Sequence, residues 1–330
     1  MKAILLKSPG RADNLYIGEA PTPQISNRQL LIKVRSCGVN RADILQREGK
    51  YPPPKGESPI IGLEVSGVVE EVGGECERFQ AGDHVVALLA GGGYAEYVAV
   101  DESLVMPVPA GLSFEEAAGI AEVFITAYQA LFYIAKLEKG QTALIHAGAS
   151  GVGTAAIQLC HSIGAKSIVT AGSTEKIRFC EALGASSGIN YRDTPAFDGH
   201  VLEHTGGKGA DVIIDPIGAS YFDRNLKAIA TDGRWVLLAA MGGAKVPEMN
   251  LGKLLVKRVS LTGSTLRSRD STYKARLVRQ FSEQFLNSFE SGALKPVIDQ
   301  VFPWEEVAKA HRYMEQNRNT GKIILSITRE

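Results

Sequence analysis

The sequence has little of what marks secreted, membrane or nucleic-acid-binding proteins. Its four cysteines form no C-x-x-C pair and the first residues, MKAILLKSPG, hold no signal-like apolar core, so we expect a reducing, cytoplasmic setting. Basic and acidic residues number 36 each, which leaves no net field to attract nucleic acid or an anionic membrane. No apolar run approaches the roughly 20 residues of a membrane span. We therefore expect small-molecule partners and neither nucleic acid nor membrane.

Metal-binding clusters are also lacking. No cysteine cluster offers a structural zinc site. The histidines are scattered over predicted strands, helices and loops, so we predict no metal centre. Structural roles are the default for all six: His84, His146, His161, His200, His204 and His311.

The most informative stretch that is present reads QTALIHAGASGVGTAAIQLCHSIG, from Gln141 to Gly164. Thr142 to His146 is apolar and β-rich enough for a buried strand, and a helix follows the glycine-dense turn. In dinucleotide-binding turns, glycines allow the sharp bend, the approach of the pyrophosphate and close packing of the helix. The middle glycine slot is a serine, but the amides at the helix start still favour an anionic phosphate. The predicted phosphate-binding residues are Gly148, Ser150, Gly151, Val152 and Gly153.

The length suggests about two domains, and the predicted pattern of strands and helices changes near residue 123. Residues 1–122 show short β-like segments between glycines and prolines, with one short helix at Arg41–Arg47. Residues 123–265 alternate strands and helices, which predicts a doubly wound parallel sheet covered on both faces. Among these elements we expect a helix over Tyr221–Ala230, a strand over Arg234–Ala240 and a helix over Leu251–Lys257. Residues 266–330 carry a long amphipathic helix and two strands that fit the β-rich domain better, so we expect the chain to return to it.

The tip of the second predicted strand indicates which dinucleotide binds. An NAD site has an acidic residue about 20 positions beyond the glycine turn, but this tip reads Gly172-Ser173. Small residues followed by Lys176 would accept a 2′-phosphate, which favours NADPH. Tyr191, after the third strand, is a further candidate contact. The alternative is that Glu175 binds the ribose and that the lysine is a solvated helix charge.

Several segments together resemble a known family. GLEVSGVVEEVG, AGDHVVAL, ITAYQAL, HAGASGVGTAAIQL and GKIIL are similar to the zinc-independent medium-chain dehydrogenase/reductases, within the zeta-crystallin-like quinone oxidoreductases. GVNRADILQR, the YPPP loop, AGGGYAEYV and LRSRD resemble the stress-inducible NADPH:quinone reductase group. The resemblance implies a Rossmann domain, a GroES-like barrel, and NADPH as hydride donor. Asn40, Leu63 and Glu122 match the metal-ligand slots of zinc-dependent members, and they are poor zinc ligands.

The resemblance also implies where an acceptor would bind. We expect a quinone near the Leu266-Arg267 turn, with hydrogen bonds from Asn40 and Tyr51. Asp43 is an orienting or capping residue, its charge held by Arg41 or Arg47. The same resemblance places cofactor contacts at Asn40, Thr126, Gly242, Gly243 and Lys322. Plain structural roles stay open for these residues: a loop-organising amide, a packed aromatic, a helix hydroxyl or a surface lysine.

Two other functions are compatible with the sequence, and a homodimer is predicted. An enone or alkenal double-bond reductase would use the same turn with a differently shaped acceptor pocket. A non-catalytic NADPH-binding protein is a reading from another class, because fold does not fix function. Val259–Ser264 is predicted to be an apolar sheet edge, and the resemblance implies that it pairs with a second copy in a homodimer.

Overall fold

A computed structural model describes residues 1–327. The chain divides into two compact units, which are described separately below. Unit 1 comprises Met1–Ile125 together with Leu266–Glu330, and unit 2 comprises Thr126–Thr265. One stretch, Phe114–Ile134, is long and apolar enough to cross a membrane by length and composition alone. Its most apolar window is 72% buried inside the protein, as is usual for a core helix.

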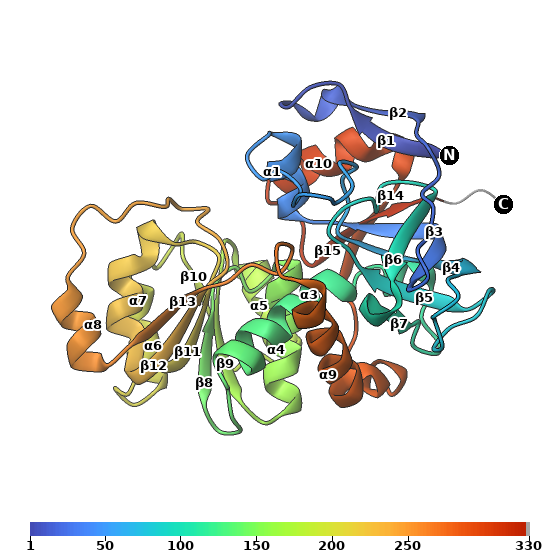
Figure 1. The fold of residues 1–330 in the computed structure, drawn as a ribbon. Coiled ribbons are helices and arrows are strands. Elements are labelled where there is room, and N and C mark those ends of the chain that lie inside the picture. The colour runs from blue at the N-terminus through green and yellow to red at the C-terminus, as the bar shows by residue number, and fades with distance from the viewer. Residues whose placement is uncertain (328–330) are drawn as a thin grey trace. The chain divides into compact units, whose positions relative to one another are not determined.

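Unit 1 is built on a seven-stranded sheet (Figure 1). The long strand β3 lies at its centre, because β4 pairs with one edge while β6 and β15 pair with successive parts of the other. All pairings are antiparallel except that of β14 with β15. The strands are β3 (Gln29–Val39), β4 (Glu64–Val72), β5 (His84–Leu88), β6 (Tyr97–Asp101), β7 (Val105–Pro107), β14 (Ile298–Pro303) and β15 (Lys322–Ser326). A separate antiparallel pair is formed by β1 (Lys2–Leu6) and β2 (Leu15–Glu19).

Two helices of unit 1 begin at a capping box. Asn40 and Asp43 form a capping box at α1 (Arg41–Arg47), and Ser113 and Glu116 form another at α2 (Phe114–Ala117). The longest helix, α9 (Ser271–Glu290), buries a phenylalanine stripe that packs against Phe124. The other helical elements are η1 (Ala12–Asn14), η2 (Glu102–Leu104), η5 (Trp304–Glu306), α10 (Val307–Glu315) and α3 (Ala121–Tyr128), which crosses into unit 2.

Unit 2 is a six-stranded parallel sheet of order β10-β9-β8-β11-β12-β13. The order reverses between β8 and β11, which is the switch point of a doubly wound fold. The strands are β8 (Thr142–Ile145), β9 (Lys166–Ala171), β10 (Ser187–Asn190), β11 (Ala210–Asp215), β12 (Ile229–Leu237) and β13 (Ser260–Gly263). The connecting helices are η3 (Gln129–Ile134), α4 (Gly151–Ser162), α5 (Thr174–Ala182), α6 (Phe197–His204), η4 (Ala219–Tyr221), α7 (Phe222–Ala228) and α8 (Leu251–Lys257).

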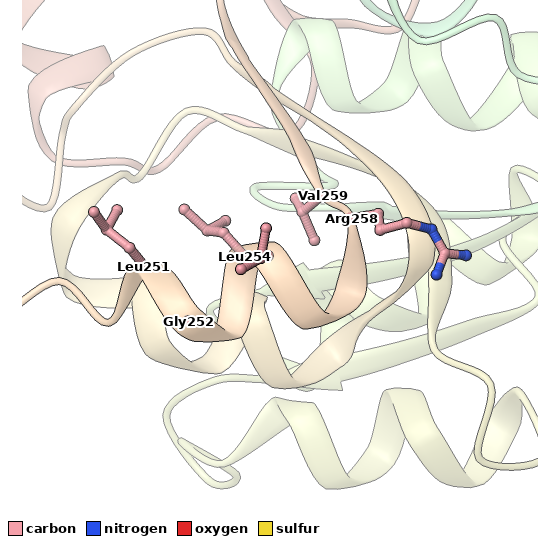
Figure 2. Close-up of a pocket in the computed structure, with 6 residues that line it drawn as sticks. Leu251, Gly252, Leu254, Arg258 and Val259 are labelled. Carbon is pink, nitrogen blue, oxygen red and sulfur yellow. The ribbon is translucent and has the colours of Figure 1, made fainter.

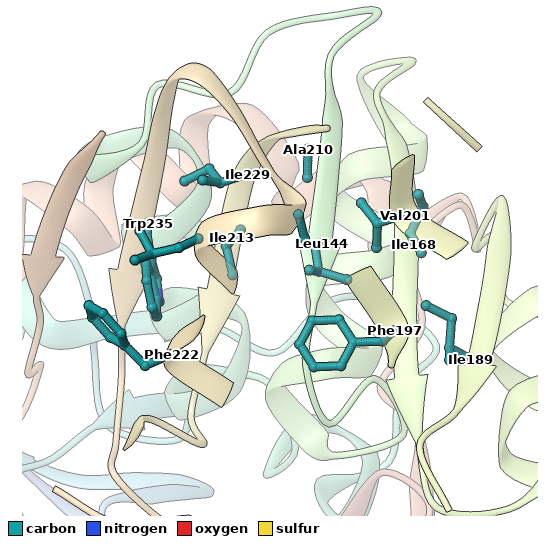
Figure 3. Close-up of a cluster of buried hydrophobic side chains, with 12 residues drawn as sticks. Leu144, Ile168, Ile189, Phe197, Val201, Ala210, Ile213, Phe222, Ile229 and Trp235 are labelled. Carbon is teal, nitrogen blue, oxygen red and sulfur yellow. The ribbon is translucent and has the colours of Figure 1, made fainter. Parts of the chain in front are cut away.

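A buried apolar cluster fixes one face of this sheet (Figure 3). Leu144 and Ile213 come from the central strands, Phe197 from α6, and Phe222 from α7. Trp235 is 1% exposed, and its ring lies 5.2 Å from that of Phe222. Burying side chains of this size stabilises the unit by about 1.5–3 kcal/mol each. The cluster therefore holds the strand ends, where ligands of doubly wound sheets bind, on a rigid base.

Several expected elements have different bounds, and some were not predicted. The helix expected over Tyr221–Ala230 ends at Ala228, because Ile229 is a core residue of β12. β12 therefore begins before the expected Arg234 and ends at Leu237. The sequence pattern did not predict α6 or the β1–β2 hairpin. By contrast, α1 and α8 have the expected bounds.

Candidate functional site

The glycine-dense turn lies between β8 and α4. Ser150 is the N-cap of α4, and its Oγ accepts the Gly153 amide at 3.0 Å. The Gly148 amide donates to the Thr170 carbonyl at 2.9 Å, which ties the turn to β9. A side chain at Gly148 or Gly153 would collide with Val169 or with the turn backbone. The predicted middle slot is thus a capping serine. The amides of Gly151 and Val152 stay at the open helix end, where an anion is favoured.

The end of β9 carries the predicted 2′-phosphate residues. Ser173 caps α5, with its Oγ accepting the Lys176 amide at 3.3 Å. Tyr191, 37% exposed, lies directly over Gly172, where an added Cβ would be 2.7 Å from its hydroxyl. The same Cβ would be 3.6 Å from Arg192 Nε. Sequence reasoning missed this arginine, although its position beside Tyr191 is the signal that could have revealed it.

A buried polar network cross-links the strand ends of unit 2. His146 lies just after β8, and its Nε2 is 2.7 Å from Asn225 Oδ1 while its Nδ1 is 3.0 Å from Thr170 Oγ1. Asn225 and Trp235 both donate to Asp215 Oδ2, at 3.1 and 3.0 Å. Burial lowers the pKa of His146, so the neutral imidazole can be at once donor and acceptor. The default structural role of this histidine agrees with these contacts.

The loops after β11 and β12 are bonded to each other. Asp215 Oδ1 accepts the amides of Ile217 and Gly218 at 2.6 and 3.0 Å. Gly242 donates to the Ile217 carbonyl at 2.7 Å, and a side chain there would collide with Ser220. The carbonyl of Gly243 accepts the Ala219 amide at 2.9 Å. The packing and hydrogen bonds of these two loops thus explain the two glycines without a bound cofactor. Close approach to a nicotinamide stays a prediction.

In unit 1, Glu64 and Lys322 form a fully buried ion pair. The ammonium group lies 2.6 Å from Glu64 Oε1, 2.7 Å from Asn40 Oδ1 and 3.0 Å from the Val39 carbonyl. Glu64 Oε1 also accepts from Asn40 Nδ2 at 3.0 Å, and its Oε2 accepts the Glu122 amide at 2.8 Å. All three ammonium protons have acceptors within unit 1, so the structure gives Lys322 an internal role. Its predicted cofactor contact is untested.

Asp43 is fully buried and closes the capping box of α1. Its Oδ2 accepts the Asn40 amide at 2.7 Å and lies 3.2 Å from the Tyr94 hydroxyl. The Tyr94 hydroxyl also lies 3.2 Å from His311 Nε2. Arg47 can only donate, so His311 Nδ1, 3.4 Å away, accepts and its Nε2 carries the proton. Burial and Arg47 lower the pKa of His311 to about 3, which agrees with a neutral ring.

The capping role expected of Asp43 is confirmed, but the expected charge partners are wrong. Arg41 bonds instead to the Met314 carbonyl and to Asn317. Arg47 forms its ion pairs with Glu48 and Glu315. Without an arginine partner, burial dominates and raises the pKa of Asp43 to about 7.

Tyr51 and Glu122 are partly exposed, and the buried side chain of Arg267 lies near both. The Arg267 guanidinium lies 5.4 Å from the centre of the Tyr51 ring and donates to the Tyr51 carbonyl at 3.3 Å. It also donates to Gln46 Oε1 at 2.7 Å and to the Ala90 carbonyl at 2.7 Å. Burial raises the pKa of Tyr51. Burial and Glu64 together raise the pKa of Glu122 to about 8. The arrangement offers an aromatic face beside a fixed cation and a neutral carboxyl.

Thr126 lies in α3 and is partly buried, and its cofactor contact stays a prediction. A pocket on unit 2 is lined by residues of α8 and the turn after it, none of which is a predicted site residue. Figure 2 shows Leu251 and Leu254 on the same side of α8, with Val259 beyond the end of the helix.

Comparison with known proteins decides the family. An alcohol dehydrogenase GroES-like domain matches residues 26–110, and a zinc-binding dehydrogenase domain matches residues 151–283. Human quinone oxidoreductase is 33% identical over 332 residues, covering 98% of this chain and 97% of that protein. The chain belongs to the quinone oxidoreductase family of the medium-chain dehydrogenase/reductases. The resemblance, the Rossmann-like unit 2 and the GroES-like domain of unit 1 are thereby confirmed.

Solved structures in and around this family share the fold over the whole chain. An Escherichia coli quinone oxidoreductase complexed with NADPH superposes with a TM-score of 0.89 at 28% identity, covering 99% of this chain and 100% of that one. The CurK enoyl reductase superposes with a TM-score of 0.87 at 29% identity, covering 98% of both chains. Members of the fold thus include proteins named for two different acceptor types.

The zinc named by one domain model does not fit the residues at the three ligand slots. Leu63 is apolar, and the Asn40 amide group is already bonded to both Lys322 and Glu64. Only the carboxyl of Glu122 remains, and Lys322 places a positive charge where a second cation would be repelled. Within residues 1–327, no three His, Cys, Asp or Glu side chains gather to hold a metal ion. One carboxylate beside an ammonium ion is not a zinc site.

Proposed function

We propose that the protein is an NADPH-dependent quinone reductase that needs no metal ion. The main support for NADPH over NADH is the end of β9, where Gly172 and Ser173 occupy the positions at which an NAD site has an acidic residue. Tyr191 and Arg192 lie against that glycine, so the surroundings suit a 2′-phosphate. The NADPH complex of the Escherichia coli relative supports the same choice.

In this proposal each unit has its own task. The open amides at the start of α4 hold the pyrophosphate, and the bonded loops after β11 and β12 give the nicotinamide end a fixed wall. Bound NADPH supplies the hydride. In unit 1, Tyr51 and Arg267 orient a flat acceptor, with the tyrosine ring as stacking face. The Asn40 side-chain amide already donates to Glu64 and accepts from Lys322, so it is less free to bind an acceptor.

A quinone suits a site without a metal ion. A metal ion polarises a carbonyl and stabilises the oxyanion that hydride addition leaves. A quinone needs less help, because the negative charge is delocalised over a conjugated ring. The residues at the metal-ligand slots, one apolar and one already bonded, agree with this acceptor class.

A double-bond reductase is the second candidate. The similarity to an enoyl reductase favours it, because that protein has the same fold over nearly the whole chain. An α,β-unsaturated carbonyl also delocalises the charge left by hydride addition, so the absence of zinc ligands does not separate the two candidates.

The test follows NADPH absorbance with purified protein and a chelator present throughout. An ortho-quinone, a para-quinone and an enal are added in turn. We expect chelator-resistant oxidation with a quinone. Turnover with the enal alone would move the assignment to double-bond reduction. Tight NADPH binding without turnover on any acceptor would indicate the non-catalytic binding protein.

A further inference from the structure

Three acidic side chains of unit 1, Glu64, Asp43 and Glu122, are near enough for their charges to interact, and they differ in their hydrogen-bond partners. Glu64 is fully buried and has both oxygens occupied by Lys322, Asn40 and the Glu122 amide. Asp43 is also fully buried, and its bonded oxygen faces the Asn40 amide and Tyr94. Neither can reach a molecule that arrives from solvent.

Glu122 is the exception among these three. It lies in the first turn of α3, where the bond from its amide to Glu64 Oε2 fixes its backbone. Its side chain is partly exposed, and within residues 1–327 its carboxyl has no hydrogen-bond partner. Tyr51 and Arg267 lie near enough for their charges to interact with it. A carboxyl that is fixed, unpaired and reachable beside an aromatic face is placed to exchange a proton with a bound molecule.

The charged groups around Glu122 set its protonation state. Burial most of all, and then Glu64 on β4 and Asp43 on α1, disfavour its negative form. Lys322 on β15 and Arg267 favour it, but less strongly, and the net effect raises the pKa to about 8. Tyr51 also faces it. The carboxyl therefore holds its proton at neutral pH, and the two cations stabilise the carboxylate that forms when the proton leaves.

We propose that Glu122 is the general acid of the reduction, which rests on the proposed function. Hydride addition gives the quinone two electrons and one hydrogen and leaves a hydroquinone monoanion. The Glu122 carboxyl then donates its proton to the negatively charged oxygen of this monoanion. A new O–H bond forms there as the carboxyl O–H bond breaks. The products are hydroquinone, NADP⁺ and a Glu122 carboxylate. Water restores the proton through the exposed part of the side chain.

The pH dependence has a definite sign. The acid must be protonated to act, so kcat stays constant below pH 8 and falls about tenfold per pH unit above it. The test compares kcat from pH 5.5 to 9.5 for wild type, Glu122→Gln and Glu122→Asp, at saturating NADPH and quinone. We expect Glu122→Gln to lose about 100-fold in kcat, as is typical for a lost general acid, and to lose the break near pH 8. Glu122→Asp, which keeps an acid, retains a break.

Controls separate this role from a structural one. Glu70→Gln changes an exposed carboxyl on β4 and should leave kcat and its pH profile unchanged. NADPH affinity, measured by fluorescence, should stay within twofold of wild type in Glu122→Gln. If Glu122→Gln keeps the wild-type kcat and the same break near pH 8, the general-acid role of Glu122 is excluded while the proposed function stands. Absence of any wild-type turnover would overturn the proposed function with it. If Glu122→Gln does not fold, a wild-type profile without a break near pH 8 would equally overturn it.

Discussion

Gly172 and the side chains against it show how single residues decide a cofactor. A carboxylate at this strand end would repel a 2′-phosphate, whereas the glycine leaves room for the Tyr191 hydroxyl and Arg192. The residue type could be predicted from the spacing to the glycine turn. Arg192 was missed although it follows the predicted Tyr191, because only the pairing of β10 with β9 shows that the arginine side chain also reaches Gly172.

Lys176→Ala and Arg192→Ala should each weaken NADPH binding by about 10- to 100-fold and leave NADH binding nearly unchanged. The reason is that a lost charge-assisted hydrogen bond costs about 1.5–3 kcal/mol, and only NADPH carries the phosphate. Dissociation constants from nucleotide fluorescence would measure this. Lys166→Ala, which removes an exposed lysine at the other end of β9, is the control. Equal weakening of both nucleotides would exclude a 2′-phosphate role.

At the scale of elements, local patterns were predictable and long-range pairings were not. The start of α1 and the turn before α4 depend on caps and glycines a few residues apart, so the sequence reveals them. The Glu64–Lys322 pair joins β4 to β15, and no local spacing indicates it. The same holds for Tyr94 and His311, which complete the surroundings of Asp43. The sequence therefore predicts the capped helix starts, but it does not predict the partners of the charges in the candidate site.

The Glu64–Lys322 pair holds four elements, because its bonds reach β4, β15, the N-cap of α1 and the first turn of α3. Lys322→Met should lower the free energy of unfolding by about 3–5 kcal/mol, since it leaves a buried carboxylate without its cation. Urea denaturation at pH 7 would measure this. Adding Glu64→Gln to that variant should recover part of the loss by removing the unpaired charge. Lys33→Met, at an exposed position on β3, should change stability by less than about 0.5 kcal/mol. An equal effect of both lysine variants would contradict the role of the pair.

At the scale of the whole molecule, the parallel sheet ends in an open edge at β13. All four of its residues are exposed, and Leu261 among them is 38% exposed. The preceding helix α8 exposes Leu255 and Val256 by 77% and 78%. An apolar edge strand with unpaired backbone groups is a template for another strand. We propose that a second copy of this chain covers it, with the two β13 strands paired about a two-fold axis.

Light scattering after size exclusion should therefore give a mass of twice 35.4 kDa. Leu261→Lys should shift the protein to the monomer, because a two-fold axis brings the two lysines toward each other on adjoining strands. Val301→Lys is the matched control, since Val301 is 45% exposed on β14, an edge strand of the seven-stranded sheet of unit 1. This variant should remain dimeric. A wild-type protein that stays monomeric at micromolar concentration would exclude the pairing. A dimer that survives Leu261→Lys but dissociates with Val301→Lys would instead place the interface on unit 1.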